Sequence, residues 1–117
     1  MRKPAQYVYV AKVGEWAKVG IARDVKARAK QLFYHHKMDV EVVRVWRVGA
    51  KALDVETLCI REMWDRRAAY GREFFMVPVE ELAARVSEIV RCVRSGAVRG
   101  RRVSIHAGAE AQEVEER

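Results

Sequence analysis

A glutamate within an apolar helical stripe stands out among the residues that could do chemistry. Ala52, Glu56, Cys59 and Met63 follow one another at spacings of four, three and four, which places them on one face of a helix. Burying a carboxylate is costly unless the charge is paired or bound to a cation. Glu56 therefore binds a cation, pairs with a neighbouring arginine, or reaches the solvated edge of the helix. The spacing alone leaves all three open.

Two further residues could take part in chemistry, and each also has an ordinary explanation. Arg28 lies beside the apolar stripe of a predicted helix, one turn after Val25 and one turn before Leu32. A solvated surface arginine would fit there equally well. Tyr9 belongs to a strand-like run, in which a tyrosine is either a packed aromatic residue or a reactive phenol. Neither position decides between the two interpretations.

Three segments predict the strands that would carry these residues. Residues 7–11 and 16–21 are rich in β-branched and aromatic types, and the glycine between them is typical of a hairpin. Residues 39–48 alternate between apolar and polar types, with one slip near 42–43. We therefore expect a small three-stranded antiparallel sheet.

Three helices are predicted around this sheet. Asp24 has the position of an N-cap before a helix with apolar residues three and four apart, helical spacing returns over 52–67, and Pro78 opens a third helix that Gly96 ends. Residues 71–75 are too short for a helix and form a loop or a brief extended segment that buries Phe74 or Phe75. The fold class is α/β (α+β), a sheet flanked by helices.

The chain length and composition predict one globular domain. The 117 residues are 50% hydrophobic and 33% charged, and no apolar run approaches the roughly 20 residues that span a bilayer. We place the domain at 1–96 and expect residues 97–117 to form a charged, mobile tail. No signal peptide is recognisable at the start, so we expect a cytoplasmic protein. Cys59 and Cys92 are predicted to be reduced core thiols.

The charge of the chain favours a polyanionic partner. A formal net charge of +7 and a pI near 9.8 attract nucleic acid through phosphate neutralisation and counterion release. Many basic proteins bind no nucleic acid, so composition alone does not decide the partner.

Five segments in order resemble the GIY-YIG nuclease superfamily, in particular its small phage-associated branch. They are Tyr7-Val8-Tyr9-Val10, Lys18-Val19-Gly20-Ile21, the basic helix from Asp24 to Leu32, the helix from Ala52 to Cys59, and Arg72-Glu73-Phe74-Phe75. The resemblance covers roughly residues 6–76. It implies a GIY-YIG-like fold and a metal-dependent endonuclease that hydrolyses DNA phosphodiester bonds.

The resemblance also implies the site. Tyr9 would activate or position the attacking water, and Arg28 would stabilise charge on the phosphoryl oxygens. Glu56 would hold one divalent cation, Mg²⁺ or Mn²⁺. Lys18 would add a positive contact to the phosphate, with Gly20 and Glu73 as supporting residues. We expect these side chains to converge on one concave face of the sheet.

The chain departs from the family pattern at three positions. Lys18 stands in place of a tyrosine, Cys59 in place of a histidine, and Arg72 in place of a glycine. The cysteine puts any proton transfer at its position in doubt.

Further basic residues are predicted to contact nucleic acid, expected to be DNA. They are Arg23, Lys26, Lys30, Arg72, Arg91 and Arg94. We explain His35 and His36 by the dipole at a helix end and leave them out of the site. A homodimer or a partner protein that supplies specificity is a further expectation.

Two other functions fit the same sequence. The domain is either a nucleic-acid-binding module of this fold that has lost cleavage, or a protein-interaction domain whose basic surface binds an acidic partner. Metal-dependent cutting separates the nuclease from both.

Overall fold

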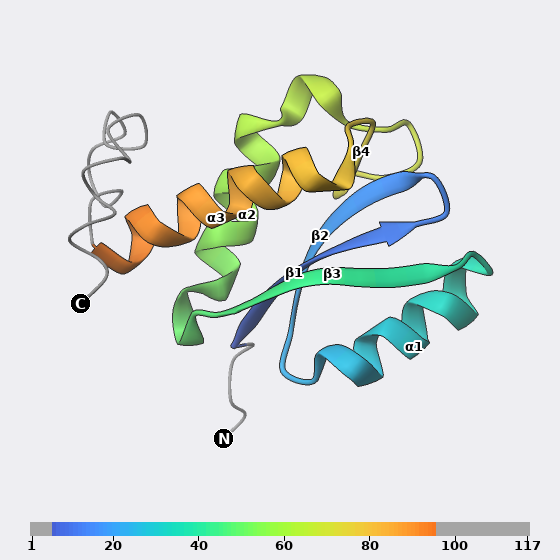
Figure 1. Cartoon of the computed structure of the whole chain (residues 1–117), viewed down its shortest axis with the longest axis horizontal. Helices are drawn as coiled ribbons and strands as arrows, with labels where there is room; N and C mark the ends of the chain where they lie inside the picture. Colours follow the sequence, from blue (N-terminus) through green and yellow to red (C-terminus); the bar gives the residue numbers. More distant parts are fainter. Residues whose placement is uncertain (1–5, 96–117) are drawn as a thin grey trace.

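The computed structural model describes residues 6–95, so Gly96 and the predicted tail lie outside the described residues. Within this part of the chain, an antiparallel sheet is packed between helices, as the sequence predicts (Figure 1). None of its helices is long and apolar enough to cross a membrane.

The sheet has four strands, one more than predicted. β1 (Tyr7–Val13) and β2 (Trp16–Ala22) form the predicted hairpin, and β3 (Val40–Arg47) and β4 (Phe74–Phe75) complete the order β3-β1-β2-β4. Within the sheet, β4 pairs only with β2, at Ala17 and Lys18. Two residues are too few to show an alternating sequence pattern, so this strand is recognised only by its pairing with β2.

The slip in the third strand is a β-bulge. Val10 pairs with Arg44 and Ala11 pairs with Val42, which leaves Val43 as the extra residue. The bulge restores the alternation on each side of it, and this explains why the sequence pattern breaks once and then continues.

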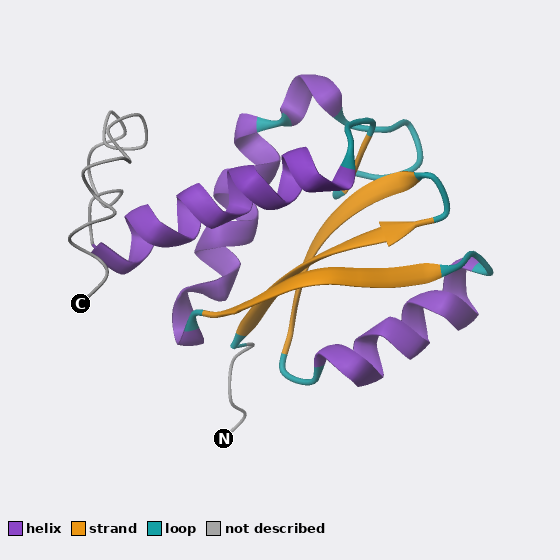
Figure 2. Cartoon of the chain, viewed as in Figure 1, coloured by secondary structure: helices purple, strands orange, loops and turns teal. Residues whose placement is uncertain are grey.

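Three α-helices follow the predicted order (Figure 2). α1 (Val25–His36) begins at Asp24, whose side chain accepts a hydrogen bond from the Ala27 amide at 3.1 Å, as an N-cap does. α2 (Ala52–Glu62) follows a 3₁₀ turn at Gly49–Lys51, and α3 (Val79–Ser95) begins after Pro78.

α2 is shorter than the predicted helix, which extended to Arg67. After Glu62 the chain tightens into a 3₁₀ turn at Trp64–Arg66, and Arg67 is extended and bridges to Phe75. The helix ends early because this segment turns back toward β4.

The two faces of the sheet have separate cores. Val8, Val10 and Val19 pack against α2 and α3, whereas Tyr9, Ala11 and Phe74 belong to the core beneath α1. Figure 1 shows α1 on one side of the sheet and the other two helices on the opposite side. The strand period of two therefore decides which helix each residue of β1 and β2 faces.

Candidate nuclease site

The first part of the site is the contact between Tyr9 and Gly20. These residues are paired across β1 and β2, and a Cβ at position 20 would clash with Cζ and Oη of Tyr9. Only glycine leaves room for the ring at this position. The ring is 1% exposed, and its hydroxyl has no hydrogen-bond partner within residues 6–95.

Lys18 lies beside this tyrosine and is 2% exposed, the one buried charged residue of the described part of the chain. Its Nζ donates to the Val19 carbonyl at 3.3 Å and to Oε2 of Glu73 at 3.4 Å. The same atom lies 5.6 Å from the ring centroid of Tyr9 and 5.4 Å from that of Phe74. The two aromatic rings and the Glu73 carboxylate together offset the cost of burying the Lys18 ammonium group.

β4 brings Glu73 to this position. Phe74 pairs with Lys18, and the Glu73 carbonyl accepts a hydrogen bond from the Val19 amide at 3.2 Å. The Glu73 side chain is 33% exposed, so one carboxylate both pairs with the buried lysine and reaches the surface.

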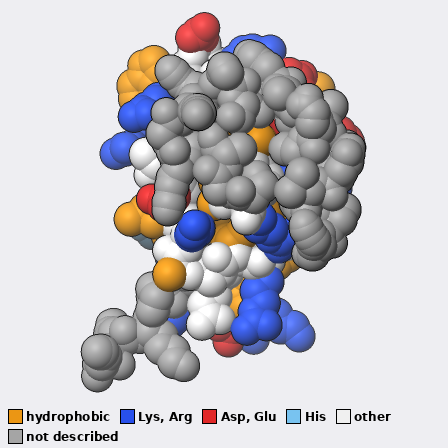
Figure 3. Space-filling model, turned by 90° about the vertical axis from the view of Figure 1, so that its left-hand side faces the viewer, with side chains coloured by type: hydrophobic (Ala, Val, Ile, Leu, Met, Phe, Trp, Pro, Cys, Tyr) orange, Lys and Arg blue, Asp and Glu red, His pale blue; other side chains and the backbone are white. Residues whose placement is uncertain are grey.

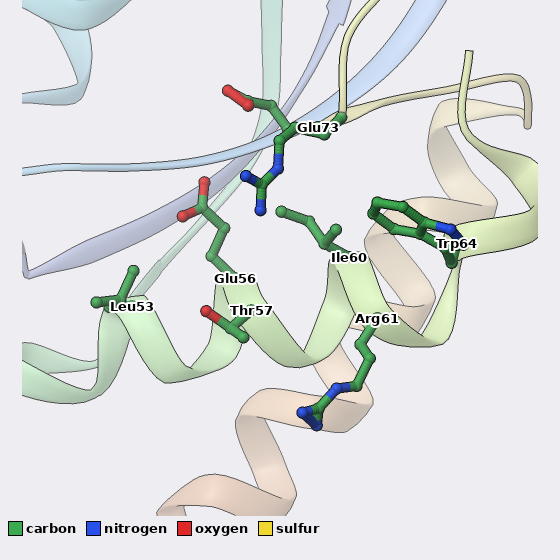
Figure 4. Close-up of a pocket in the computed structure, with 8 residues that line it drawn as sticks. Leu53, Glu56, Thr57, Ile60, Arg61, Trp64 and Glu73 are labelled. Carbon is green, nitrogen blue, oxygen red and sulfur yellow. The ribbon is translucent and has the colours of Figure 1, made fainter. Parts of the chain in front are cut away.

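Glu56 approaches from α2. Burial raises the pKa of its carboxyl group, the charge of Glu73 raises it further, and Lys18, Arg72 and Arg28 act in the opposite direction. Glu56 has no hydrogen bond or ion pair within the described residues. Of the three interpretations that the sequence left open, pairing with a neighbouring arginine is therefore not the one observed. Figure 4 shows its side chain pointing from α2 toward Glu73.

Two adjoining cavities surround these groups. One, of about 500 Å³, is lined by Glu56, Arg72, Glu73 and residues of α2 (Figure 4). The other, of about 720 Å³, is lined by Lys18, Arg28, Glu73 and the last turns of α1. Glu73 lines both cavities and therefore marks the place where they meet.

The four predicted site residues do not converge on one face of the sheet. Tyr9, Lys18 and Arg28 lie on the α1 side, whereas Glu56 belongs to a helix that covers the opposite side. β4 pairs with β2 over only two residues, so groups from both sides can approach each other around this edge of the sheet.

The sequence that forms this site matches a known protein family. A model of the T5orf172 domain matches residues 6–94, about three quarters of the chain. The chain belongs to the T5orf172 domain family. Domains of this family are phage-associated and occur in nuclease-related proteins, so membership suggests a nuclease-related or DNA-related function without showing a specific activity. Neither the curated proteins nor the solved structures include a match to this T5orf172 domain.

The other basic residues predicted to contact nucleic acid are spread over this T5orf172 domain. Arg72 lines the cavity of Glu56, and Lys26 and Lys30 are exposed on α1. Arg23 is exposed just after β2. Arg91 and Arg94 lie near the end of α3 that is remote from β4 (Figure 1).

Arg94 also has a contact within the fold, because its guanidinium donates to the Arg47 carbonyl at 2.7 Å. Lys and Arg side chains are visible in several places on the side of the molecule where α3 ends (Figure 3). The structure thus brings Arg72 to the candidate site and leaves Arg91 and Arg94 away from it.

Two carboxylates of this site, Glu56 and Glu73, are the residues that could hold a divalent cation of the Mg²⁺ type. No group of three or more His, Cys, Asp or Glu side chains that could hold a metal lies within residues 6–95. Mg²⁺ needs no such cluster, because it keeps several waters and is held by one or two carboxylates together with substrate phosphates. Glu56, with a raised pKa and no partner, has the chemistry of such a ligand, and Glu73 is the second carboxylate within electrostatic range.

Sequence reasoning left out residues that line the α1 cavity. Tyr34, His35 and His36 all border it. Nδ1 of His36 lies 2.6 Å from the Tyr70 hydroxyl, a contact that no local pattern could indicate. The pKa of His36 is lowered, chiefly by burial and then by the neighbouring His35.

Cys59 is a core residue of this domain. It is fully buried and has no disulfide partner, and burial raises the pKa of its thiol to about 12. A thiol of this kind stays protonated near neutral pH and does not replace a histidine in proton transfer.

Proposed function

We propose that this T5orf172 domain is an endonuclease that hydrolyses DNA phosphodiester bonds with one divalent cation, in the manner of the GIY-YIG nucleases it resembles. The observation that supports this most is the arrangement around Glu56. An unpaired carboxylate of raised pKa shares one sheet edge with Lys18 and Arg28, two cations suited to a phosphate. Glu56 is half-buried, and no partner in the described part of the chain offsets the cost of removing its charge from water.

Arg28 and Lys18 would bind and orient the scissile phosphate. They line the same cavity, and fixed positive groups stabilise the charge that grows on phosphoryl oxygens during hydrolysis. Glu73 would hold Lys18 in place through their contact at 3.4 Å. Arg72, which lines the adjoining cavity, would contact a neighbouring phosphate of the same DNA strand.

Glu56 would hold the cation, with Glu73 as the second available carboxylate. A bound Mg²⁺ or Mn²⁺ supplies Lewis-acid polarisation of the phosphate. Tyr9 would orient the attacking water through its unpaired hydroxyl. Since that hydroxyl is buried, water reaches it only when neighbouring side chains move.

The buried hydroxyl also favours a second candidate function, a nucleic-acid-binding module without cleavage. In this reading the Tyr9 ring is a packing element over Gly20, and Cys59 marks the loss of a catalytic histidine. The basic groups around the cavities would then serve binding alone.

The test is a nicking assay. Purified protein is incubated with supercoiled plasmid and with labelled single-stranded and branched DNA, in Mg²⁺, in Mn²⁺ and in chelator. Glu56→Gln is compared with Glu41→Gln, which changes an exposed glutamate of β3 in the same way. We expect metal-dependent nicking that Glu41→Gln retains and Glu56→Gln lowers at least about a hundredfold.

Two other results would change the conclusion. DNA binding without nicking by any variant supports the binding module. Metal-dependent nicking that Glu56→Gln retains would show that another group holds the cation.

A further inference from the structure

The cavity beneath α1 has aromatic residues in its lining in addition to the basic residues that would contact a phosphate. Besides Lys18 and Arg28, it is lined by Phe74, Tyr34 and His36. Its volume of about 720 Å³ is in the range of cavities that enclose small organic ligands. A phosphate group alone occupies a small part of such a space.

The rings at this cavity have different degrees of burial. Phe74 is buried and lies edge-on to His36 at 5.4 Å between centroids, which makes a rigid aromatic floor. Tyr34 is 66% exposed and touches only the neighbouring Phe33 ring among the described aromatic residues. Most of the Tyr34 ring surface is therefore accessible to a ligand in the cavity that this residue lines.

The position of Tyr34 relative to Arg28 suits one nucleotide. The two residues lie six positions apart on α1, and at about 1.5 Å rise per residue their Cα atoms are about 9 Å apart along the axis. Six residues also turn the chain by about 120° around the helix axis, so it is their common cavity that allows a phosphate held by Arg28 and a base resting on Tyr34 to belong to the same or to adjacent nucleotides. Both residues line the same cavity.

From these observations we infer that the α1 cavity binds an unpaired nucleobase of the strand whose phosphate lies at Lys18 and Arg28. A base inside a stacked duplex cannot enter a concave site, whereas an unpaired base can stack on an aromatic side chain. The substrate class is thus single-stranded DNA, or duplex DNA with an unpaired base beside the scissile bond. This inference rests on the proposed function, because it names the substrate of the same site.

The test measures binding and not cleavage. Fluorescence anisotropy compares labelled oligothymidylate with an abasic oligonucleotide of the same length and charge, in chelator. The full chain is compared with Tyr34→Ala, with Tyr34→Phe, which keeps the ring, and with Met76→Ala, which changes an exposed residue that lines neither cavity.

Wild type and Tyr34→Phe should prefer the base-bearing strand. Tyr34→Ala should weaken thymidylate binding about tenfold, the loss of one stacked base, and leave abasic binding nearly unchanged. Met76→Ala should have no effect. Equal affinity of wild type for both strands, or an equal effect of Tyr34→Ala on both, overturns the inference.

Failure of this inference is distinguishable from failure of the proposed function. Nicking that depends on Glu56 without base-selective binding removes the base site and leaves the nuclease. Base-selective binding without any nicking retains the base site within a binding module.

Discussion

At the scale of single residues, Tyr9 carries a buried hydroxyl that has no hydrogen-bond partner within the described part of the chain. An unsatisfied buried polar group costs about 1 to 3 kcal/mol of stability. Such a cost is commonly retained where function needs the group. The Tyr9 hydroxyl is therefore expected to lower the stability of the fold and to be needed for activity.

Tyr9→Phe separates these two effects. The substitution removes the hydroxyl and keeps the ring over Gly20, so we expect the free energy of unfolding to rise by about 1 kcal/mol. Nicking should fall in the same variant. Urea unfolding and the plasmid assay measure the two quantities. A loss of stability would show that the hydroxyl has a partner.

Glu56 predicts a pH dependence of stability. Its pKa is raised in the folded protein, so the folded state binds the proton more tightly than the unfolded state does. Stability contributed by this group is therefore greatest below the ordinary glutamate pKa of 4.5 and falls as pH rises through the folded pKa. We expect Glu56→Gln to be more stable than wild type at pH 7, with a difference that shrinks as pH falls toward 4.5.

Glu41→Gln is the control for this measurement, since the side chain is exposed on β3. Its stability difference from wild type should change little over the same pH range in urea titrations. A constant difference between Glu56→Gln and wild type would contradict the assignment of Glu56 as a half-buried, unpaired acid.

At the scale of elements, the ion pair of Lys18 and Glu73 links β2 to the segment that leads into β4. Removing one partner of a buried pair leaves an uncompensated charge, which costs more than the pair itself contributes. Glu73 is partly exposed, so water screens part of that cost.

A double-mutant cycle tests this link. Glu73→Gln should lower the free energy of unfolding by about 1 to 2 kcal/mol, because Lys18 stays buried without its carboxylate. In the Lys18→Met background the same change should cost at least about 0.5 kcal/mol less. Additive effects in urea unfolding would mean that the 3.4 Å contact carries no coupling energy.

At the scale of the whole molecule, positive charge is distributed over separated regions. Arg72 belongs to the candidate site, whereas Arg94 lies at the far end of α3 and contacts the Arg47 carbonyl. If nucleic acid binds at the candidate site, Arg72 neutralises a phosphate and Arg94 does not.

The salt dependence of DNA binding measures this difference. Each neutralised phosphate contributes about 0.9 to the slope of log affinity against log salt for duplex DNA. We expect Arg72→Gln to reduce the slope by about 0.9 and Arg94→Gln to leave it unchanged. Equal reductions in anisotropy titrations would mean that the bound strand extends to the end of α3.

The local elements could be predicted from the sequence because their signals lie within a few residues. The hairpin, the Asp24 cap, the slip in alternation near Val43 and the helix after Pro78 each depend on spacings of two to four or on one turn residue. The predicted chemical roles of Tyr9, Lys18, Arg28 and Glu56 stay predictions, because no measurement of activity bears on them.

Tertiary structure decided what depends on residues far apart in the chain. β4 exists because Phe74 and Phe75 meet β2, and Lys18 pairs with a glutamate 55 positions away. Glu56 and Arg28 belong to helices on opposite faces of the sheet, and Glu73 lies between them because it lines both the cavity of Glu56 and the cavity of Arg28. A sequence pattern describes which face of its own element a residue occupies, and only packing determines what that face meets.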